Sequence, residues 1–434
     1  MTDLTGSALD HRLTVWRDLT EVGILESDAS GRLRFTYHEA VWDRPECAVS
    51  VRLPVRRAPY GDRDALPCFE NLLPESDLRT VLAQSAHRSP NDVVGLLGVI
   101  GGECAGALTL WPEGFGPPDP PAYAPCTRAT LERLFGGRAV SEAPTASGPL
   151  PQRLARQSMS GVQAKIVLRR EPTVGDRDVT YRLPVNGAPG NVICKRDRLH
   201  YPGLVANEIA SMSLMERAGV PTAPRTVNAL HEAVYETARF DRLSQPDGRI
   251  RRLHAEDGCQ LTGFVSINKY ADPSGPTFQM LSAALNRYSG DAATDRERLL
   301  RWALANIVIG NRDAHAKNVS LLYDAQDTRR LAPAYDVVCT LAYPELDRTL
   351  PLALGGTRQV DAFNAHTPVV IAREFGLTAG LVREVLDDVV ACMAGALDDV
   401  LQAVATQTGD QVTCDTLHRI VAVEAEALRT RCLD

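Results

Sequence analysis

The hydrophobic pattern of this chain changes from short alternating segments to long helical stripes near residue 275. Before that point it is typical of strands, as in Leu33-Arg34-Phe35-Thr36-Tyr37, where large apolar residues alternate with others. After it, the pattern predicts helices at 277–288, 295–309, 368–374, 378–404 and 415–430. A β-rich part followed by an α-rich part predicts an α+β fold of two lobes with a ligand between them.

The part before residue 275 contains two groups of strands. Strands are predicted at 12–16, 33–37, 50–55, 106–111, 166–169, 179–183, 191–195, 225–227 and 233–239, and helices at 69–84, 91–97, 127–135 and 204–218. Six prolines in residues 112–125 indicate a connection between the groups. We therefore predict an N-terminal subdomain at 1–123, a small lobe at 124–240 and a helical lobe at 241–434.

Charge and cysteine content indicate the cellular compartment and the classes of partner that the chain favours. A net charge of -7 gives no general attraction to nucleic acid or to an anionic membrane. Ten cysteines are scattered without a CxxC pair, so neither a zinc site nor a disulfide framework is predicted. The first residues lack a signal-peptide pattern, and we see no run of about 18 apolar residues. These features predict a cytoplasmic protein that does not bind membranes.

The stretch from Gly310 to Asn318 carries the clearest chemistry. Asp313 stands five residues before Asn318, and Asp336 follows Asn318 by 18 residues, directly after Tyr335. Phosphoryl transfer to a hydroxyl needs a carboxylate to take the proton, and an amide oxygen and a second carboxylate to hold magnesium. We predict these roles for Asp313, Asn318 and Asp336. Each residue alone also fits a polar loop with an Asx turn.

Several residues before this stretch suit a nucleotide site, with a simpler alternative for each. Lys195 ends an apolar strand, where a lysine contacts phosphates in kinases or is simply an exposed strand end. Glu208, on the next helix, either pairs with Lys195 or faces solvent. The extended segment Ala238-Arg239-Phe240 offers backbone groups to an adenine, whereas the following Asp241 and Arg242 also fit a surface ion pair.

Taken in order, these landmarks resemble the HipA family, the serine/threonine-kinase toxins of bacterial toxin–antitoxin pairs. The resemblance covers nearly the whole chain. Its further landmarks are Phe69 to Ser76, Gly106 to Leu110, Ser158 to Lys165, Asn207-Glu208, Arg239 to Arg242 and Glu256 to Gln260.

The resemblance implies a protein-kinase-like fold, similar also to lipid kinases, with a β-rich N-terminal part and an all-α C-terminal lobe. It implies ATP and Mg²⁺ as cofactors and Asp313 as catalytic base. The residues implied at the nucleotide are Ser160, Gly161, Val162, Gln163, Ala164 and Lys165 as phosphate loop, Lys195, the hinge Ala238, Arg239 and Phe240, and His315, Ala316, Lys317, Asn318, Tyr335 and Asp336. Asn318 and Asp336 are the implied metal ligands, and Ser158 or Ser160 is an implied autophosphorylation site.

The resemblance also implies partners. These are a helix-turn-helix antitoxin similar to HipB, operator DNA reached mainly through that antitoxin, and an aminoacyl-tRNA synthetase as substrate. Two other functions stay open from the residues: a non-catalytic module that binds the antitoxin, and a small-molecule or lipid kinase. Transfer of phosphate to protein, to a metabolite or to neither would separate the three.

Overall fold

The structure is a computed structural model that describes residues 11–135, 164–171, 180–197, 201–227, 234–270 and 275–433. The chain divides into two units that alternate along the sequence. The N-terminal unit contains Met1–Cys194, Asp241–Glu256 and Leu322–Asp327, and the helical unit contains Lys195–Phe240, Asp257–Leu321 and Thr328–Asp434. The predicted boundaries at residues 123 and 240 stay a prediction.

An antiparallel sheet of four strands in the order β3-β2-β1-β4 begins the N-terminal unit. Its strands are β1 (Arg12–Arg17), β2 (Thr20–Ser27), β3 (Leu33–Tyr37) and β4 (Leu108–Pro112). Leu33, Phe35 and Tyr37 are buried, whereas Arg34 between them is exposed. This two-residue period turns one face of β3 toward the core.

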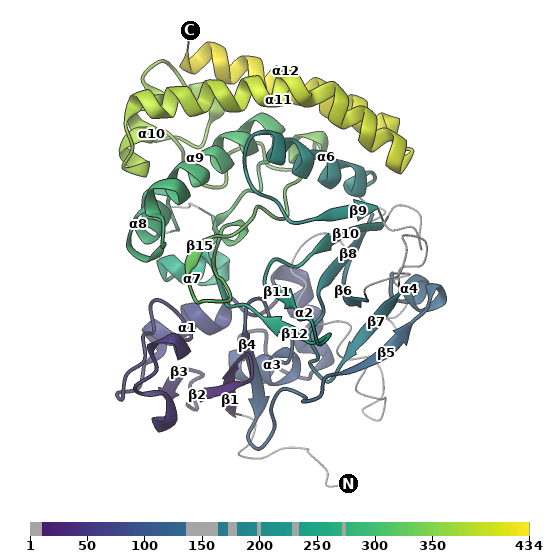
Figure 1. The fold of residues 1–434 in the computed structure, drawn as a ribbon. Coiled ribbons are helices and arrows are strands. Elements are labelled where there is room, and N and C mark those ends of the chain that lie inside the picture. The colour runs from purple at the N-terminus through teal and green to yellow at the C-terminus, as the bar shows by residue number, and fades with distance from the viewer. Residues whose placement is uncertain are drawn as a thin grey trace. The chain divides into compact units, whose positions relative to one another are not determined.

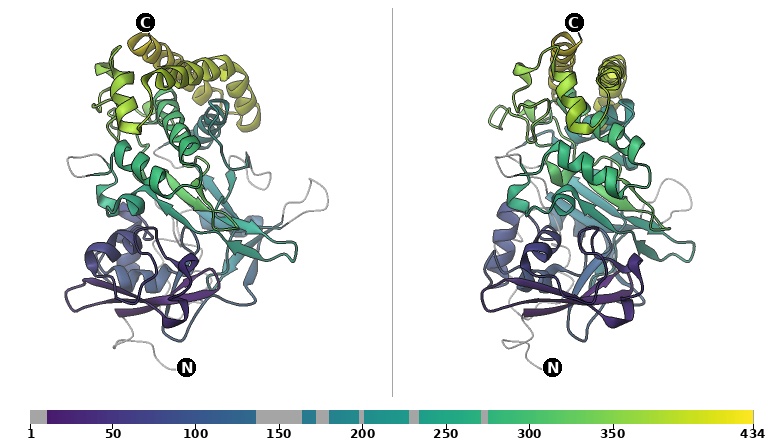
Figure 2. Two further views of the ribbon diagram at one scale, coloured as in Figure 1. Left: turned by 60° about the vertical axis from the view of Figure 1, so that its left-hand side comes forward. Right: turned by 90° about the vertical axis from the view of Figure 1, so that its left-hand side faces the viewer.

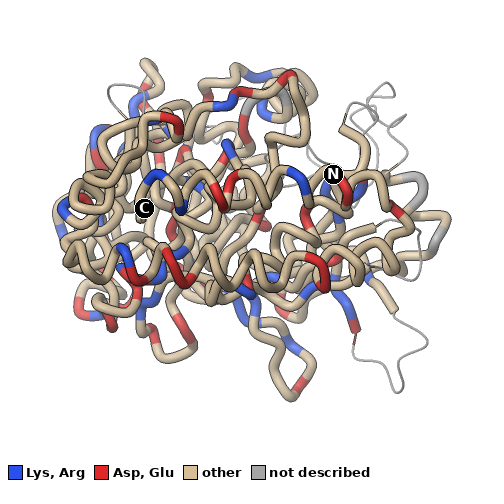
Figure 3. Tube along the Cα trace, turned by 90° about the horizontal axis from the view of Figure 1, so that it is seen from above, with Lys and Arg blue, Asp and Glu red and all other residues tan. Residues whose placement is uncertain are grey.

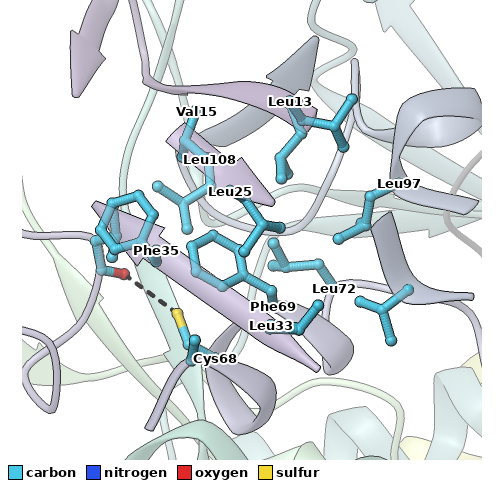
Figure 4. Packing of buried hydrophobic residues seen from close by; sticks show 14 of the residues in the cluster. Leu13, Val15, Leu25, Leu33, Phe35, Cys68, Phe69, Leu72, Leu97 and Leu108 are labelled. Carbon is cyan, nitrogen blue, oxygen red and sulfur yellow. Dashed lines mark hydrogen bonds between the residues drawn. The ribbon is translucent and has the colours of Figure 1, made fainter. Parts of the chain in front are cut away.

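Three helices accompany this sheet: α1 (Asp62–Glu70), α2 (Ser76–Ser85) and α3 (Val93–Ile100). Their apolar residues complete one core, in which Phe35 and Phe69 have ring centroids 5.2 Å apart. Figure 4 shows this packing beside Cys68, whose thiol donates to the Val49 carbonyl oxygen. The helix predicted at 69–84 is therefore two helices, because Pro74 disfavours a helical conformation at the residue before it.

A second set of strands belongs to the same unit. β5 (Ala122–Cys126), β7 (Tyr181–Val185) and β6 (Ala164–Arg170) lie side by side in that order, with α4 (Arg128–Phe135) against β6. Thr127 Oγ1 accepts a hydrogen bond from the Thr130 amide, as expected for the predicted helix cap. The proline-rich connection ends earlier than predicted, because β5 pairs with β7 from residue 122.

The predicted strand at 50–55 is wrong. Ser50 and Leu53 form only an isolated bridge, and the Leu53 amide closes a tight turn onto the Ser50 carbonyl oxygen. Pro54 has no amide hydrogen to give to a sheet. The Ser50 hydroxyl and the Val51 amide donate instead to the carboxylate of Glu256, so this turn serves a buried side chain.

The segment 241–256 supplies the remaining strands of the N-terminal unit. β11 (Arg242–Ser244) pairs with β12 (Ile250–Arg252), and β13 (Ala255–Asp257) ends at the boundary of the unit. Three-residue strands of this kind carry too little alternation to be predicted from the sequence.

The helical unit contains the elements that hold the candidate site. Its helices are α6 (Leu204–Arg217), α7 (Gly258–Thr262), α8 (Phe278–Tyr288), α9 (Ala292–Ile309), α10 (Thr367–Phe375), α11 (Ala379–Thr408) and α12 (Gln411–Cys432). α11 packs on α6, α9 and α12, and α11 and α12 run side by side in both views (Figures 1 and 2). The helices predicted after residue 275 are confirmed, with ends shifted by a few residues.

Short strands also belong to this unit. β9 (Arg225–Val227) pairs antiparallel with β10 (Val234–Ala238), against which α6 packs. β8 (Val192–Arg196) and β14 (Ser320–Tyr323) cross the boundary between the units, and β14 neighbours β15 (Arg329–Leu331). Asp295 of α9 is fully buried and accepts hydrogen bonds from the Arg330 side chain and the Leu331 amide, which fixes β15 on α9.

One helix of the helical unit is unusually long and apolar. α11 is long and apolar enough to cross a bilayer by length and composition alone, although no apolar run of that length was predicted. Half of its most apolar window is buried in the fold, as in core helices of water-soluble proteins. All ten cysteines are free thiols, as predicted. Basic and acidic residues are interspersed along the trace seen from above (Figure 3).

Candidate active site

The loop that follows α9 begins from a rigid support. Gly310 ends the helix with φ 79°, a left-handed conformation that glycine adopts without strain. The Asn311 amide group donates to Asn306 Oδ1 at 2.7 Å, and Asn311 Oδ1 accepts from the Asp313 amide at 2.9 Å. The apolar helix predicted at 295–309 therefore holds the backbone of Asp313 through two side-chain amides.

Asp313 itself is exposed, as a group that meets a substrate has to be. The Tyr270 hydroxyl donates to Asp313 Oδ1 at 2.8 Å. The ring of Tyr270 also contacts His315 edge-on, with centroids 5.4 Å apart. Tyr270 was not among the predicted site residues, because it lies 43 positions before Asp313 and outside every motif that we recognised.

Asn318 and His315 close the loop as a short 3₁₀ turn, η6 (Ala316–Asn318). Both side chains are buried, and Asn318 Oδ1 accepts from the His315 amide at 3.1 Å. Burial lowers the pKa of His315 well below its ordinary value, and the positive charges of Lys269 and Lys317 lower it further. The imidazole is therefore neutral at pH 7.

Lys195 joins two carboxylates that are far apart in the sequence. Its ammonium nitrogen lies 2.5 Å from Glu208 Oε1 of α6 and 2.7 Å from Asp336 Oδ1. Lys195 and Glu208 are almost fully buried, whereas the Asp336 side chain is 37% exposed. Burial alone would lower the pKa of Lys195, but the attraction of Asp336 and Glu208 outweighs it and raises that pKa. Lys195 is thus a charged lysine, and the possibility that Glu208 faces solvent is excluded.

Asp336 is held by its backbone as well as by Lys195. Its φ of 57° is a left-handed conformation that few residues other than glycine adopt. Three residues later, Asn207 of α6 donates to the Cys339 carbonyl at 3.0 Å and accepts from the Cys339 amide at 2.8 Å. The helix that carries Glu208 therefore also fixes the segment that carries Asp336.

Lys317 and Tyr335 extend the site toward α7. Lys317 Nζ lies 2.6 Å from Asp257 Oδ2, and Asp257 caps α7 by accepting from the Gln260 amide. The Tyr335 hydroxyl donates to the Lys317 carbonyl oxygen at 2.6 Å, and its ring lies 5.3 Å from that of Phe240. The role of Asp257 was missed, although its motif Glu256 to Gln260 was noted as a landmark.

The helical unit thus brings together most of the predicted site residues that it contains. Contacts in the described residues connect Lys195 with Asp336, Phe240 with Tyr335, Tyr335 with Lys317, and His315 with Asn318. Ala316 is buried between them. The Ala238 amide already donates to the Pro224 carbonyl at 2.8 Å, so this amide hydrogen is engaged within the protein. Arg239 is buried at the end of the same strand.

The predicted phosphate loop is described only at its end. Ala164 and Lys165 begin β6 in the N-terminal unit. Ser158, Ser160, Gly161, Val162 and Gln163 lie outside the described residues.

Asp241 and Arg242 do not form a surface pair. Both are buried in the N-terminal unit, where Arg242 Nη2 lies 2.9 Å from Glu103 Oε1 and Asp241 Oδ2 accepts from the Gly106 amide at 2.7 Å. Arg252 contacts the other carboxylate oxygen of Glu103 at 3.3 Å. Only the fold reveals this network, because 139 residues separate Glu103 from Arg242.

The side chains present fit a magnesium–nucleotide complex. Asp336 and Asn318 supply a carboxylate and an amide oxygen, which are hard ligands that magnesium accepts when phosphates and water provide the rest. Among the described residues there is no group of three His, Cys, Asp or Glu that would hold a metal unaided.

Comparison with known proteins shows the family to which the chain is related. The model of the HipA-like C-terminal domain matches residues 157–397, and that of the HipA N-terminal domain matches residues 13–111. Y4mE of Sinorhizobium fredii, named as a candidate kinase, is 34% identical over 427 residues, covering 96% of this chain and 98% of that protein. The serine/threonine-protein kinase toxin HipA of Shewanella oneidensis is 24% identical, covering 88% and 87%.

A solved structure shares the fold. It is the complex of HipA, HipB and operator DNA from Shewanella oneidensis, with a TM-score of 0.76, 21% identity and 96% coverage of both chains. Fold and site together define an α+β protein of the two-lobed, kinase-like class. The chain belongs to the HipA family of kinase toxins, as the predicted resemblance implied.

Proposed function

We propose that this chain is an ATP-dependent serine/threonine protein kinase that acts as the toxin of a toxin–antitoxin pair. The observation that supports this most directly is the buried Lys195, whose ammonium contacts Glu208 and Asp336 in the same unit as the Asp313 loop. Protein kinases use such a lysine–glutamate pair to hold ATP phosphates, next to a metal-binding aspartate.

Each side chain has a role in the proposed transfer. Asp313 accepts the proton of the substrate hydroxyl while the hydroxyl oxygen bonds to the γ-phosphorus and the bond from that phosphorus to the β–γ bridging oxygen breaks. Lys195 leaves Asp336 for the phosphates. Asn318 and Asp336 would hold magnesium, which would neutralise the phosphate charges.

The nucleotide itself has contacts proposed from the family resemblance. Ser160 to Lys165 form its phosphate loop, Ala238 to Phe240 its hinge, and Tyr335 with His315 to Asn318 its lining. The tilted ring pair of Phe240 and Tyr335 supports an aromatic surface beside an adenine. Neutral His315 is suited to donate or accept a hydrogen bond without adding charge.

Regulation and partners are proposed from the family as well. Autophosphorylation at Ser158 or Ser160 would inactivate the chain, because a phosphate dianion is repelled from a loop that binds ATP phosphates. A small helix-turn-helix antitoxin similar to HipB would bind the chain and carry it to operator DNA, as in the Shewanella complex. The net charge of -7 and the interspersed charges of Figure 3 favour contact with DNA mainly through that partner. An aminoacyl-tRNA synthetase, glutamyl-tRNA synthetase in particular, is the proposed substrate.

The test is transfer from labelled Mg-ATP by the purified chain. We expect label on Ser158 or Ser160 and on an added aminoacyl-tRNA synthetase, and no label with Asp313→Ala. Asp398→Ala is the control, because Asp398 is a 91% exposed aspartate on α11 whose partner is His418. Mass spectrometry before the assay shows whether the chain arrives already phosphorylated.

Three results would redirect the proposal. Transfer to a metabolite or lipid but to no protein favours a small-molecule kinase. No transfer together with antitoxin binding favours the non-catalytic co-repressor. Normal transfer by Asp313→Ala contradicts the assignment of the base.

A further inference from the structure

The hydroxyl of Tyr270 donates a hydrogen bond to the carboxylate of Asp313. The torsion that turns an aspartate carboxylate, χ2, has broad minima and does not fix the orientation by itself. The hydrogen bond from the Tyr270 hydroxyl to Asp313 Oδ1, at 2.8 Å, restrains this torsion.

The protein holds Tyr270 in place through both its backbone and its ring. The preceding residue, Lys269, accepts a backbone hydrogen bond from Ala316 in the catalytic loop, at 3.3 Å. A Cβ atom at Gly275 would overlap the carbonyl oxygen of Tyr270, so only glycine allows the chain to return this closely. The ring contacts the neutral imidazole of His315. Tyr270 is therefore positioned from the same loop that carries the base.

This arrangement differs from a surface tyrosine that contacts a neighbour by chance. Tyr270 is 37% exposed, and Asp313 is also exposed. Both are nevertheless connected to the η6 turn. Tyr270 is connected through the hydrogen bond between Ala316 and Lys269 and through the ring of His315, and Asp313 precedes the turn directly in the chain. A hydrogen bond to an ionised group is worth more than one between neutral groups. The contact therefore constrains the carboxylate even with water nearby.

We propose that Tyr270 is a positioning residue for the transfer reaction, which sets the direction from which Asp313 receives the proton of the acceptor hydroxyl. This inference rests on the proposed function, since it assumes that Asp313 is the base. It assigns Tyr270 an effect on the chemical step rather than on nucleotide binding.

The experiment compares Tyr270→Phe with the wild type in labelled Mg-ATP transfer. The substitution keeps the ring and removes only the hydroxyl. We expect kcat to fall about tenfold while KM for ATP stays unchanged, because an interaction made in the reacting state is lost. Tyr288→Phe serves as the matched control and should have the wild-type rate. Tyr288 belongs to α8, and the Arg287 guanidinium lies over its ring.

Two further measurements separate positioning from a merely structural role. The acidic limb of the pH–rate profile should move to higher pH in Tyr270→Phe, because the carboxylate loses a donor that favours its charged form. The nearby charges of Lys269 and Lys317 and the neutral His315 are the same in both proteins, so the shift reports the hydroxyl. In an Asp313→Asn background, Tyr270→Phe should cause no further loss of the residual rate.

The outcomes are distinct. A Tyr270→Phe variant with the wild-type kcat and pH profile overturns the proposal, and so does one with a raised KM and normal kcat, which would make Tyr270 a nucleotide contact. If the wild type transfers no phosphate, the proposed function, the assignment of Asp313 as base and this inference are all contradicted. If the wild type is active and Tyr270→Phe is unaffected, only this inference is contradicted.

Discussion

The ammonium nitrogen of Lys195 lies 2.5 Å from Glu208 Oε1, and both side chains are almost completely shielded from solvent. A buried pair of this kind is costly to break, because the remaining charge loses its partner without regaining water. The same lysine contacts Asp336, which is more exposed and can be hydrated without it. We therefore expect the contact with Glu208 to matter more for stability and the contact with Asp336 to matter more for the proposed phosphate transfer.

Lys195→Met should lower the free energy of unfolding by about 3 kcal/mol and abolish phosphate transfer. The double variant Lys195→Met/Glu208→Leu should regain most of that stability, since an apolar pair can replace a buried ion pair, and remain inactive. Urea unfolding together with the labelled-ATP assay measures both. Recovery of activity in the double variant would show that Lys195 does not serve the nucleotide.

Gly258→Ala should slow transfer and destabilise the protein, because the added Cβ would lie 2.5 Å from the Ala316 carbonyl oxygen in the catalytic loop. That contact is with backbone, so the loop has to move. Gly395→Ala in α11 is the control, as its Cβ meets nothing within 4 Å. We expect the control to stabilise the chain by about 0.5–1 kcal/mol through the helix preference of alanine. Equal effects at the two positions would argue against close packing of α7 on the loop.

Glu103→Ala should cost about 3–5 kcal/mol of unfolding free energy, since buried Arg252 would lose this carboxylate, and buried Arg242 would lose it too while its contact with Asp241 remains. Glu46→Ala removes an ion pair with Arg44 in which both side chains are about half exposed, and should change stability by less than about 1 kcal/mol. Denaturant unfolding of the two variants tests the difference. A small loss for Glu103→Ala would mean that water reaches the arginines.

Stability should fall as the pH drops below about 6.5, in part because of His254. Burial lowers the pKa of His254 well below its ordinary value, and the charge of Arg17 lowers it further. Below about pH 6.5 the unfolded chain binds a proton that the folded chain refuses, so folding loses up to about 1.4 kcal/mol per pH unit. Unfolding at pH 7.5 and 5.5 should show a smaller loss for His254→Gln than for the wild type. His418→Gln, at an exposed histidine, should behave as the wild type.

Features that depend on neighbouring residues are the ones that the sequence predicts best. The structure places Asp313 and Asn318 in the loop after α9 and Lys195 in the predicted apolar strand, β8, while the catalytic roles of these residues stay predictions. The pairing of Lys195 with Glu208 was open until the fold placed α6 beside the strand. Tyr270 could not be predicted, because its contact with Asp313 depends on a return of the chain that no periodicity encodes.

The N-terminal unit illustrates the same limit on a larger scale. Its first sheet follows from alternation in residues such as Leu33 and Phe35. The burial of Arg242 does not follow from the sequence, because an Asp-Arg pair is typical of a surface. Only the fold places Glu103 against it. The turn at Ser50 was misread as a strand because its polar groups serve Glu256, about two hundred positions later.

The order of synthesis gives the network around Glu103 a further meaning. A nascent chain leaves the ribosome N-terminus first, and domains usually fold as they emerge. Here Glu103 is translated well before its partners Arg242 and Arg252, and Arg17 well before its partner Asp327. Asp327 is translated only after the loop of residues 310–318, whereas both arginines precede that loop. A premature stop before residue 242 therefore releases an N-terminal segment in which Glu103 lacks both arginines, and we expect proteases to degrade such a segment, so that it does not persist as a free-standing regulatory fragment.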